Sequence, residues 1–356
     1  MSKKVIVIGG GIIGLCSAYY LHKGGQQVTI VDQSNMDSGA SYVNAGYLSP
    51  SHIIPLAAPG VMKKGLKWMR NSSSRLYIKP SADLDFIKWV WAFNKSCNQR
   101  DVDRSIPGIK SISLLSQELY DDIKENENFN FHSEKKGLLM LCKSTRALEE
   151  EILTSEIANS EGLATVVLNE TELRTFQPNV EINALGAVHY KCDYHTTPAE
   201  FMKEMKAYLA KVGVEFLKNE KVIDLNISSR RVSSIVTHKQ TLKADVFVIA
   251  TGSWSGLLVK KLRLNLLMQA GKGYRINTQR ETGITVPAIL TESKVAVTPM
   301  NGFTRFAGTM EIAGINHNIN PVRVQAIASA VTKYYSNINL TKEEKGLAAC
   351  GLRPLS

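Results

Sequence analysis

The first 33 residues carry the clearest hydrophobic pattern in the chain. Residues 5–8 are four consecutive apolar β-branched residues, which is typical of a strand buried on both faces of a parallel sheet. Apolar residues recur at helical spacing over 15–21, and glycines 24–25 end the predicted helix. Residues 28–31 form a second apolar run. This pattern predicts a strand–helix–strand unit at the start of an α/β fold.

Residues 33–60 form a long segment rich in polar residues, small residues and prolines. A segment of this length is seldom idle in a compact domain, so we expect it to wrap around a ligand. Residues 61–131 are predicted to be helical, because apolar residues recur there every three or four positions. The aromatic stripe of one of these helices is expected to lie in the core and consists of Phe86, Trp89, Val90 and Phe93.

Beyond residue 137, short apolar runs alternate with amphipathic stretches. Helices are predicted over 146–160, over 198–212 with Thr197 as its N-cap, and over 321–335. Strands are predicted over 138–141, 165–168, 186–190, 214–217, 222–227, 232–238, 246–250 and, as an antiparallel group, within 271–312. The run 246–250 suits a return to the first sheet, so pieces of one sheet are separated by a second, mixed sheet. The sequence thus predicts two interleaved domains.

Composition narrows the class of protein. The chain has 356 residues, of which 44% are hydrophobic and 21% are charged, values that are ordinary for a globular protein. Its net charge is +11, but the basic residues form no long block, which disfavours nucleic acid as a partner. No apolar run reaches the roughly 20 residues that a membrane-spanning helix needs. The five scattered cysteines show no metal-binding spacing, so we expect reduced thiols, no metal site and a cytoplasmic location.

The run GGGIIG at 9–14 lies between the first predicted strand and its helix. Gly9 would permit a tight turn, Gly11 would let backbone approach a pyrophosphate, and Gly14 would let helix and strand pack closely. The helix N-terminus favours a bound anion. Asp32, at the end of the second strand, would accept hydrogen bonds from a ribose and favours FAD or NAD over a 2′-phosphorylated nucleotide. The alternative is a structural glycine turn in an unrelated α/β protein.

Further segments of the chain carry a more specific resemblance to a known protein family. They are GGGIIG at 9–14, Asp32, NAGYLSPSHIIPLAAPG at 44–60, LKWM at 66–69, ATGSWS at 250–255, KGYRIN at 272–277, FAGTMEI at 306–312 and GLRP at 351–354. With these the chain resembles the glycine-oxidase and D-amino-acid-oxidase group of flavoproteins, and within it the bacterial D-amino acid dehydrogenases. The resemblance implies an α/β fold in which a Rossmann-like FAD-binding domain is interleaved with an α+β substrate domain on a mixed, mainly antiparallel sheet.

The implied division assigns 1–80, 197–262 and 338–356 to the FAD-binding domain, and 81–196 and 263–337 to the substrate domain. FAD is expected to bind without a covalent link. The residues that the resemblance places at the cofactor are Ile8, Gly9, Gly10, Gly11, Ile12, Ile13, Gly14, Asp32, Gln33, Ser41, Asn44, Ala45, Gly46, Val222, Ala250, Thr251, Gly252 and Gly351.

The implied reaction is oxidative deamination of a D-amino acid, with hydride transfer from Cα to flavin N5 and hydrolysis of the imino acid to a keto acid and ammonia. Arg353, in GLRP, matches the family arginine that pairs with the substrate carboxylate; a surface arginine is the alternative. Tyr274 is a second candidate for the substrate site, or else a buried tyrosine with a satisfied hydroxyl. Arg305 and His52 are expected to be structural or solvated, and Cys350 to be a small buried thiol.

The resemblance leaves three readings of the activity open. The first is a dehydrogenase that passes electrons to a quinone, with peripheral contact at the inner membrane face. The second is an oxygen-using oxidase of glycine, sarcosine or proline-type amines, and the third is an inactive flavin-binding fragment. The family normally continues past GLRP with a segment that closes over the flavin. We therefore expect this chain, which stops at Ser356, to bind FAD more weakly than a version extended by that segment.

Overall fold

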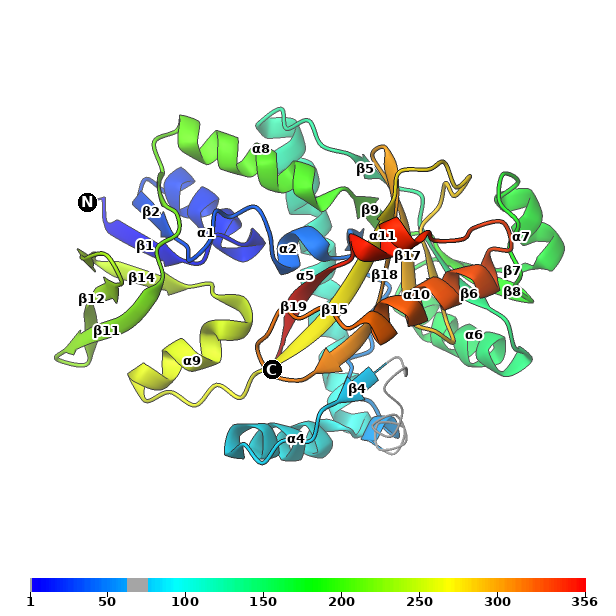
Figure 1. Ribbon diagram of the computed structural model, residues 1–356, viewed down its shortest axis with the longest axis horizontal. Coiled ribbons are helices and arrows are strands. Elements are labelled where there is room, and N and C mark those ends of the chain that lie inside the picture. The colour runs from blue at the N-terminus through cyan, green and yellow to red at the C-terminus, as the bar shows by residue number, and fades with distance from the viewer. Residues whose placement is uncertain (1, 63–75) are drawn as a thin grey trace.

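The computed structural model describes residues 2–62 and 76–356 and arranges them around two main sheets, a small one on the left of Figure 1 and a large one on the right. The small sheet has four parallel strands. Their spatial order is β10 (Glu215–Leu217), β2 (Gln27–Val31), β1 (Lys4–Ile8) and β14 (Val246–Ile249). The chain therefore does return to its first sheet through 246–249, as predicted.

Both faces of the small sheet are covered, which explains the unbroken apolar run of β1. Val5 and Val7 pack in one cluster with α1 (Ile12–Lys23) and α8 (Pro198–Lys211). Ile6 and Ile8 point to the other face and pack against α9 (Ser255–Val259) and a three-stranded antiparallel sheet. That sheet consists of β11 (Val222–Ser228), β12 (Arg231–Thr237) and β13 (Thr241–Lys243).

The large sheet has nine strands and is mixed but mainly antiparallel, as predicted. Its order is β19 (Ala349–Leu355), β15 (Gln269–Thr278), β18 (Phe303–Ile312), β17 (Val295–Met300), β16 (Ala288–Leu290), β6 (Leu138–Cys142), β8 (Gly186–Tyr190) and β7 (Thr165–Asn169). The ninth strand, β4 (Leu76–Ile78), pairs with β18 in parallel. β16 and β6 also pair in parallel. A separate small sheet joins β3 (Tyr47–Leu48), β9 (Tyr194–Thr196) and β5 (Ser133–Glu134).

Helices cover the large sheet and connect the two halves. α10 (Pro321–Tyr334) packs on one face, with α11 (Lys342–Gly346) beside it (Figure 1). α6 (Thr145–Ser160) and α7 (Glu170–Phe176) lie near β7 and β8. The long helix α5 (Gln99–Asn126) reaches both cores: its Val102 and Ile106 pack with the large sheet, and its Ile123 packs in the cluster beneath the small sheet.

The segment predicted as helical over 61–131 is only partly so. Its described part contains strand β4 as well as α4 (Leu84–Ser96) and α5, and the LKWM sequence at 66–69 lies outside the described residues. The aromatic stripe is confirmed as core, because Trp89 is buried and its three partners pack in the same cluster. Thr197 is the N-cap residue of α8, but its side chain makes no capping bond and accepts the Asn301 N–H instead.

The predicted domain boundaries stay a prediction, including the assignment of 338–356 to the FAD-binding domain. The structure shows that β19 is hydrogen-bonded along β15 and so extends the large sheet. An isolated strand carries no record of its partner, so this pairing could not be inferred from the sequence. Within the part of the chain that the structure describes, no helix combines the length and apolar character needed to span a membrane.

Candidate functional site

The glycine turn after β1 has the geometry that its spacing predicts. Gly9 has φ +109°, and a Cβ there would lie 2.4 Å from the carbonyl oxygen of Ala250. A Cβ on Gly14 would lie 1.8 Å from the Gly9 carbonyl oxygen, so helix and strand need glycine to pack. Gly11 differs, because a Cβ there would meet only the Ser41 hydroxyl, at 3.3 Å. The backbone at Gly11 is therefore the one open to a ligand.

Asp32 completes the turn on the neighbouring strand. Its Oδ2 accepts the N–H of Gly10 at 2.7 Å, and its Oδ1 accepts both the N–H and the hydroxyl of Ser34 at 2.7 Å. Its carbonyl accepts the N–H of Glu220 at 2.7 Å, which brings the start of β11, with Val222, close by. The carboxylate is fixed at the carboxyl end of the sheet, where parallel α/β sheets bind their ligands.

The predicted cofactor residues converge on this edge. Those at the ends of β1, β2 and β14 and in the first turn of α1 are Ile8, Gly9, Gly10, Gly11, Ile12, Ile13, Gly14, Asp32, Gln33, Ala250, Thr251 and Gly252. The turn after β14 also connects to the large sheet, because the Ser253 hydroxyl donates to the Leu352 carbonyl at 3.1 Å. Both sheets therefore border the same region.

The segment that follows β2 forms the short helix α2 (Ala40–Val43) and then β3. The Ser41 hydroxyl in α2 accepts the N–H of Ile12 at 2.9 Å, which holds α2 at the N-terminus of α1. The Asn44 side chain accepts the N–H of Gly46 at 2.8 Å. Gly46 has φ +76°, and a Cβ there would lie 2.3 Å from the Thr196 carbonyl. These residues lie where the resemblance places the cofactor loop.

Arg305 fixes that loop to the large sheet. Its Nη1 donates to the carbonyls of Tyr42 at 2.9 Å and Asn44 at 2.7 Å, and its side chain is almost fully buried. Thr298 adds a bond to the Ala45 carbonyl at 2.7 Å. Burial lowers the pKa of Arg305 to about 10, which still leaves it charged at neutral pH. The expectation that Arg305 is structural is consistent with these contacts.

Arg353 lies between two covered positions on one face of β19. Gly351, two residues before it, is so close to α2 that a Cβ would lie 2.9 Å from Ala40 Cα. Leu355, two residues after it, packs in a cluster with Trp89 of α4. Alternate residues of a strand share a face, so all three point to the same side. Arg353 alone among them is exposed.

The sheet surface near Arg353 is open at Gly273, whereas Gly271 is covered by the side chains of Leu355 and Met310. Gly273 of β15 pairs with Gly351, and Gly271 pairs with Arg353. A Cβ on Gly273 would meet only the Thr309 carbonyl oxygen, at 3.8 Å. A glycine surface next to an exposed guanidinium leaves room for a flat or small ligand that carries a carboxylate.

His52 is held by a hydrogen-bonded pair of side chains. The Ser51 hydroxyl donates its one hydrogen to Asp193 Oδ2 at 2.6 Å, so it can only accept from His52, whose Nδ1 lies 3.0 Å away. With Nδ1 protonated, Nε2 is the acceptor of the neutral ring. Burial raises the pKa of Asp193 to about 6, so it is ionised at neutral pH.

The charge state of His52 follows from its surroundings. Its side chain is 43% exposed, yet burial among neighbouring protein groups lowers its pKa to about 4. The positive charges of Lys294 and Arg353 lower this pKa further. His52 is therefore neutral at pH 7 and lies within electrostatic reach of the predicted substrate arginine.

Tyr274 does not join this group. It pairs with Cys350, and both residues are buried in the cluster under α10. Arg353 is three positions after Cys350, so it lies on the opposite face of β19. The Tyr274 hydroxyl donates to Glu311 at 2.8 Å, which favours the alternative of a buried, satisfied tyrosine. Cys350 is a buried free thiol, as predicted, and all five cysteines are free.

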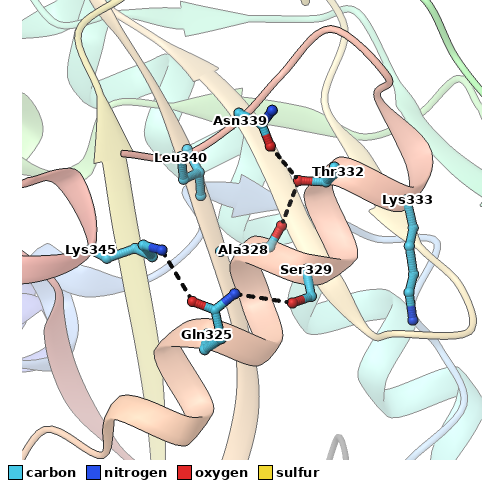
Figure 2. A pocket seen from close by; sticks show the side chains of 8 residues that line it. All are labelled: Gln325, Ala328, Ser329, Thr332, Lys333, Asn339, Leu340 and Lys345. Atoms are coloured by element: carbon cyan, nitrogen blue, oxygen red, sulfur yellow. Dashed lines mark hydrogen bonds between the residues drawn. The ribbon is translucent and has the colours of Figure 1, made fainter. Parts of the chain in front are cut away.

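A separate hollow of about 350 Å³ lies on the outer side of α10 (Figure 2). Its polar wall includes Gln325, which accepts from Lys345 at 3.1 Å and donates to Ser329 at 3.2 Å. It shares no residue with the groups described above, and a further hydrogen bond in it joins Thr332 to Asn339 at 3.1 Å.

A comparison with protein families matches residues 4–356 to the FAD dependent oxidoreductase family, DAO. The chain belongs to this family. It is therefore an FAD-dependent oxidoreductase, and the cofactor predicted from the glycine turn and Asp32 is confirmed at the level of the family.

Similar proteins that carry a functional name align with all or nearly all of this chain. A D-amino acid dehydrogenase of Helicobacter pylori is 29% identical over 358 residues, which span 100% of this chain and 85% of the relative. One from Vibrio atlanticus (strain LGP32) is 27% identical, with 99% of this chain and 86% of the relative covered. The glycine oxidase structure from Bacillus cereus ATCC 14579 matches with a TM-score of 0.72 at 20% identity, covering 100% of this chain and 84% of that one. This structural likeness shows the shared fold.

The residues present fit FAD on the evidence of this structure. The Gly11 side of the turn is open, the α1 N-terminus faces it, and a carboxylate is fixed at the adjacent strand end. A Cβ on Gly10 would lie 2.4 Å from Met36 Sδ, so the Met36 side chain would have to move to admit one. A dinucleotide could therefore lie along backbone from Gly11 toward the α2 loop.

Sequence reasoning missed some of the groups that shape the site. Asp193, which orients Ser51, is 142 positions away from it, and nothing in its local sequence marks it. The same holds for His132, Glu134 and His195, which gather beside β9. The sequence CDYH at 192–195, which follows the predicted strand 186–190, was the one available indication.

Proposed function

We propose that the chain oxidises D-amino acids, with Arg353 binding the substrate carboxylate. The observation that carries the proposal is the single exposed guanidinium between covered neighbours, beside the open surface over Gly273. A planar guanidinium pairs with a carboxylate through two parallel hydrogen bonds and fixes its orientation. The names of the relatives support the substrate class.

His52 is proposed to contact the substrate amino group. Its Nε2 has a free lone pair when Nδ1 donates to Ser51, so it accepts a hydrogen bond from an amine N–H. Because the ring is neutral at pH 7, it adds no positive charge that would repel an ammonium group. Arg353 and His52 together would orient the Cα–H bond relative to the glycine surface.

The cofactor would be held by the chain's backbone and one carboxylate. Gly11 and the α1 N-terminus would receive the pyrophosphate, Asp32 a ribose, and the loop 44–46 the flavin side. Bound FAD supplies the acceptor for the hydride that leaves Cα. The protein orients the substrate and excludes competing reactions.

A quinone in or near a membrane is proposed as the electron acceptor. The outer face of α4 exposes Leu84, Ile87 and Trp91, with 69%, 50% and 66% of their surface accessible. They recur at helical spacing, and Lys88 and Lys95 flank them. An apolar helix face bordered by lysines on a chain of net charge +11 suits an anionic bilayer surface.

Anaerobic flavin reduction tests the substrate class. Protein loaded with FAD and checked for flavin content is mixed with D-alanine, D-proline, glycine or L-alanine, and the visible spectrum is followed. We expect the D-amino acids to bleach the flavin faster than the others. Re-oxidation by a soluble quinone without peroxide formation supports the proposed acceptor, whereas rapid re-oxidation by oxygen with peroxide identifies an oxidase. Full flavin content without bleaching by any D-amino acid overturns the proposal.

A further inference from the structure

Two imidazoles and a carboxylate meet at the edge of the small sheet formed by β3, β9 and β5. His132 precedes β5, Glu134 lies in it, and His195 lies in β9. The Nε2 atom of His195 is 3.4 Å from one Glu134 oxygen, and that of His132 is 3.9 Å from the other. The ligand atoms of all three side chains lie within 4.8 Å of one another.

The backbone holds these side chains together. His132 and Glu134 are two positions apart in extended chain and so share a face. Glu134 pairs directly with His195 in the antiparallel ladder between β5 and β9. His132 Nδ1 lies 3.1 Å from the Thr197 hydroxyl, which orients the ring and leaves Nε2 toward Glu134. The cluster does not depend on long flexible side chains.

His195 points to a missing partner. Its side chain is fully buried, and neither ring nitrogen makes a hydrogen bond within the part of the chain that the structure describes. The Pro299 carbonyl lies near the ring as a backbone acceptor and raises the pKa of His195, but the contact is too distorted to be a regular hydrogen bond. Buried polar groups normally have partners, so an imidazole without one beside a carboxylate and a second imidazole indicates a ligand.

The charges around the cluster suit a cation. The Nε2 atoms of His132 and His195 face the two Glu134 oxygens, so the cluster presents two imidazoles and one carboxylate to a cation. Lys136 Nζ lies 2.9 Å from Glu134 and is 44% exposed, so a stronger cation could displace it into solvent. Glu200 is engaged by the His132 N–H and the Asn301 amide.

We propose that His132, Glu134 and His195 form a binding site for Zn²⁺. Two neutral imidazoles and one carboxylate are a ligand set that zinc accepts, with water in the fourth position. Small side-chain rotations would bring the present separations to those around a tetrahedral ion. Thr197 would then act as the outer hydrogen-bond partner that fixes the His132 ring.

The site would stabilise the loop that borders the cofactor region. The Thr196 N–H, next to His195, donates to the Gly46 carbonyl at 2.8 Å, and Tyr47 pairs with His195. An ion that joins β5 to β9 therefore also restrains the strand that supports Gly46. This role is structural and independent of the oxidation of a substrate.

Zinc titration of the metal-stripped, FAD-loaded protein tests the site. We expect one equivalent to bind by calorimetry and to raise the melting temperature. His132→Gln and Glu134→Gln should each weaken binding at least tenfold and abolish the thermal shift. His22→Gln and His238→Gln, which change histidines outside the cluster, should bind as the parent does. The 132 and 134 side chains are partly exposed, so these variants test the site even if His195→Gln fails to fold.

Cobalt substitution separates this site from cysteine sites. Co²⁺ bound to two histidines and a carboxylate gives weak visible bands without a thiolate charge-transfer band. The proposal is overturned by an absence of stoichiometric zinc binding, by a thiolate band, or by unchanged affinity in both glutamine variants. None of these outcomes depends on whether a D-amino acid bleaches the flavin.

Discussion

At the scale of single residues, accessibility separates the candidate substrate groups. Arg353 is exposed beside a glycine surface, whereas Tyr274 is 1% exposed and bonded to Glu311 on the other face of the sheet. His52 lies within electrostatic reach of Arg353 and is oriented by Ser51 and Asp193. Exposure matters here because a buried, satisfied side chain has no free donor for a substrate.

Loss of Arg353 should weaken substrate binding. Arg353→Ala is expected to raise KM for a D-amino acid by about 10- to 100-fold, since a charge-assisted hydrogen bond contributes about 1.5–3 kcal/mol. Flavin content should stay near that of the parent. Steady-state kinetics and the visible spectrum measure both. Arg100→Ala, at an exposed position of α5, serves as the control, and unchanged KM in the Arg353 variant would remove it from the site.

The pH dependence of kcat/KM should show the titration of His52. Its pKa is lowered to about 4, so the ring stays neutral as pH falls from 7 and takes up a proton only near pH 4. Protonation removes the Nε2 acceptor and adds a charge near the substrate amine, so kcat/KM should fall there. In His52→Gln that fall should be absent. If kcat/KM falls at the same acidic pH in the parent protein and in His52→Gln, the proposed contact is contradicted. Asp193, whose pKa is raised to about 6, takes up its proton first as pH falls, so only the fall near pH 4 is assigned to His52.

At the scale of elements, α4 uses its two sides differently. Trp89 and its aromatic partners pack inward against Leu355, and the Trp89 indole donates to the Leu355 carbonyl at 3.1 Å. The outward side carries Leu84, Ile87 and Trp91. An apolar surface on both sides of a helix is unusual for a helix that meets only water and the core.

Vesicle binding tests the outward side of α4. Trp91→Glu is expected to reduce binding to anionic vesicles about tenfold or more, because a buried aromatic side chain contributes about 1.5–3 kcal/mol. Its melting temperature should be little changed, since 66% of that side chain is exposed. Leu153→Glu, at a position 61% exposed on α6, is the matched control. Equal sedimentation of parent and Trp91→Glu with the vesicles would refute membrane contact through this helix.

At the scale of the whole molecule, α5 and the last strand hold together two halves, one built around the small sheet and the other around the large sheet. One end of α5 packs with the large sheet through Ile106, and the other packs beneath the small sheet through Ile123. β19 extends the large sheet and contacts both α2 and the turn after β14. The halves are therefore expected to unfold together.

A cooperative transition should reveal this coupling. Ile106→Ala and Ile123→Ala each remove a buried side chain from a different core and should destabilise by about 2–5 kcal/mol. Both should shift one common unfolding transition, measured by circular dichroism and by calorimetry. Ile112→Ala, at a position of α5 that is 68% exposed, should have little effect. Two transitions, each moved by only one of the buried variants, would show that the halves unfold independently.

The sequence by itself determined the local units and their chemistry. The β1–α1–β2 unit, the glycine positions, Asp32 and the buried stripe of α4 all follow from period, glycine spacing and strand ends, which are properties of neighbouring residues. Only the tertiary structure decided which strand β19 joins, which face Tyr274 and Arg353 take, and how Asp193 and His195 find their partners. These depend on pairing between segments far apart in the chain. A strand's alternation does not say which partner it joins, and a shift of one residue reverses the face of every side chain.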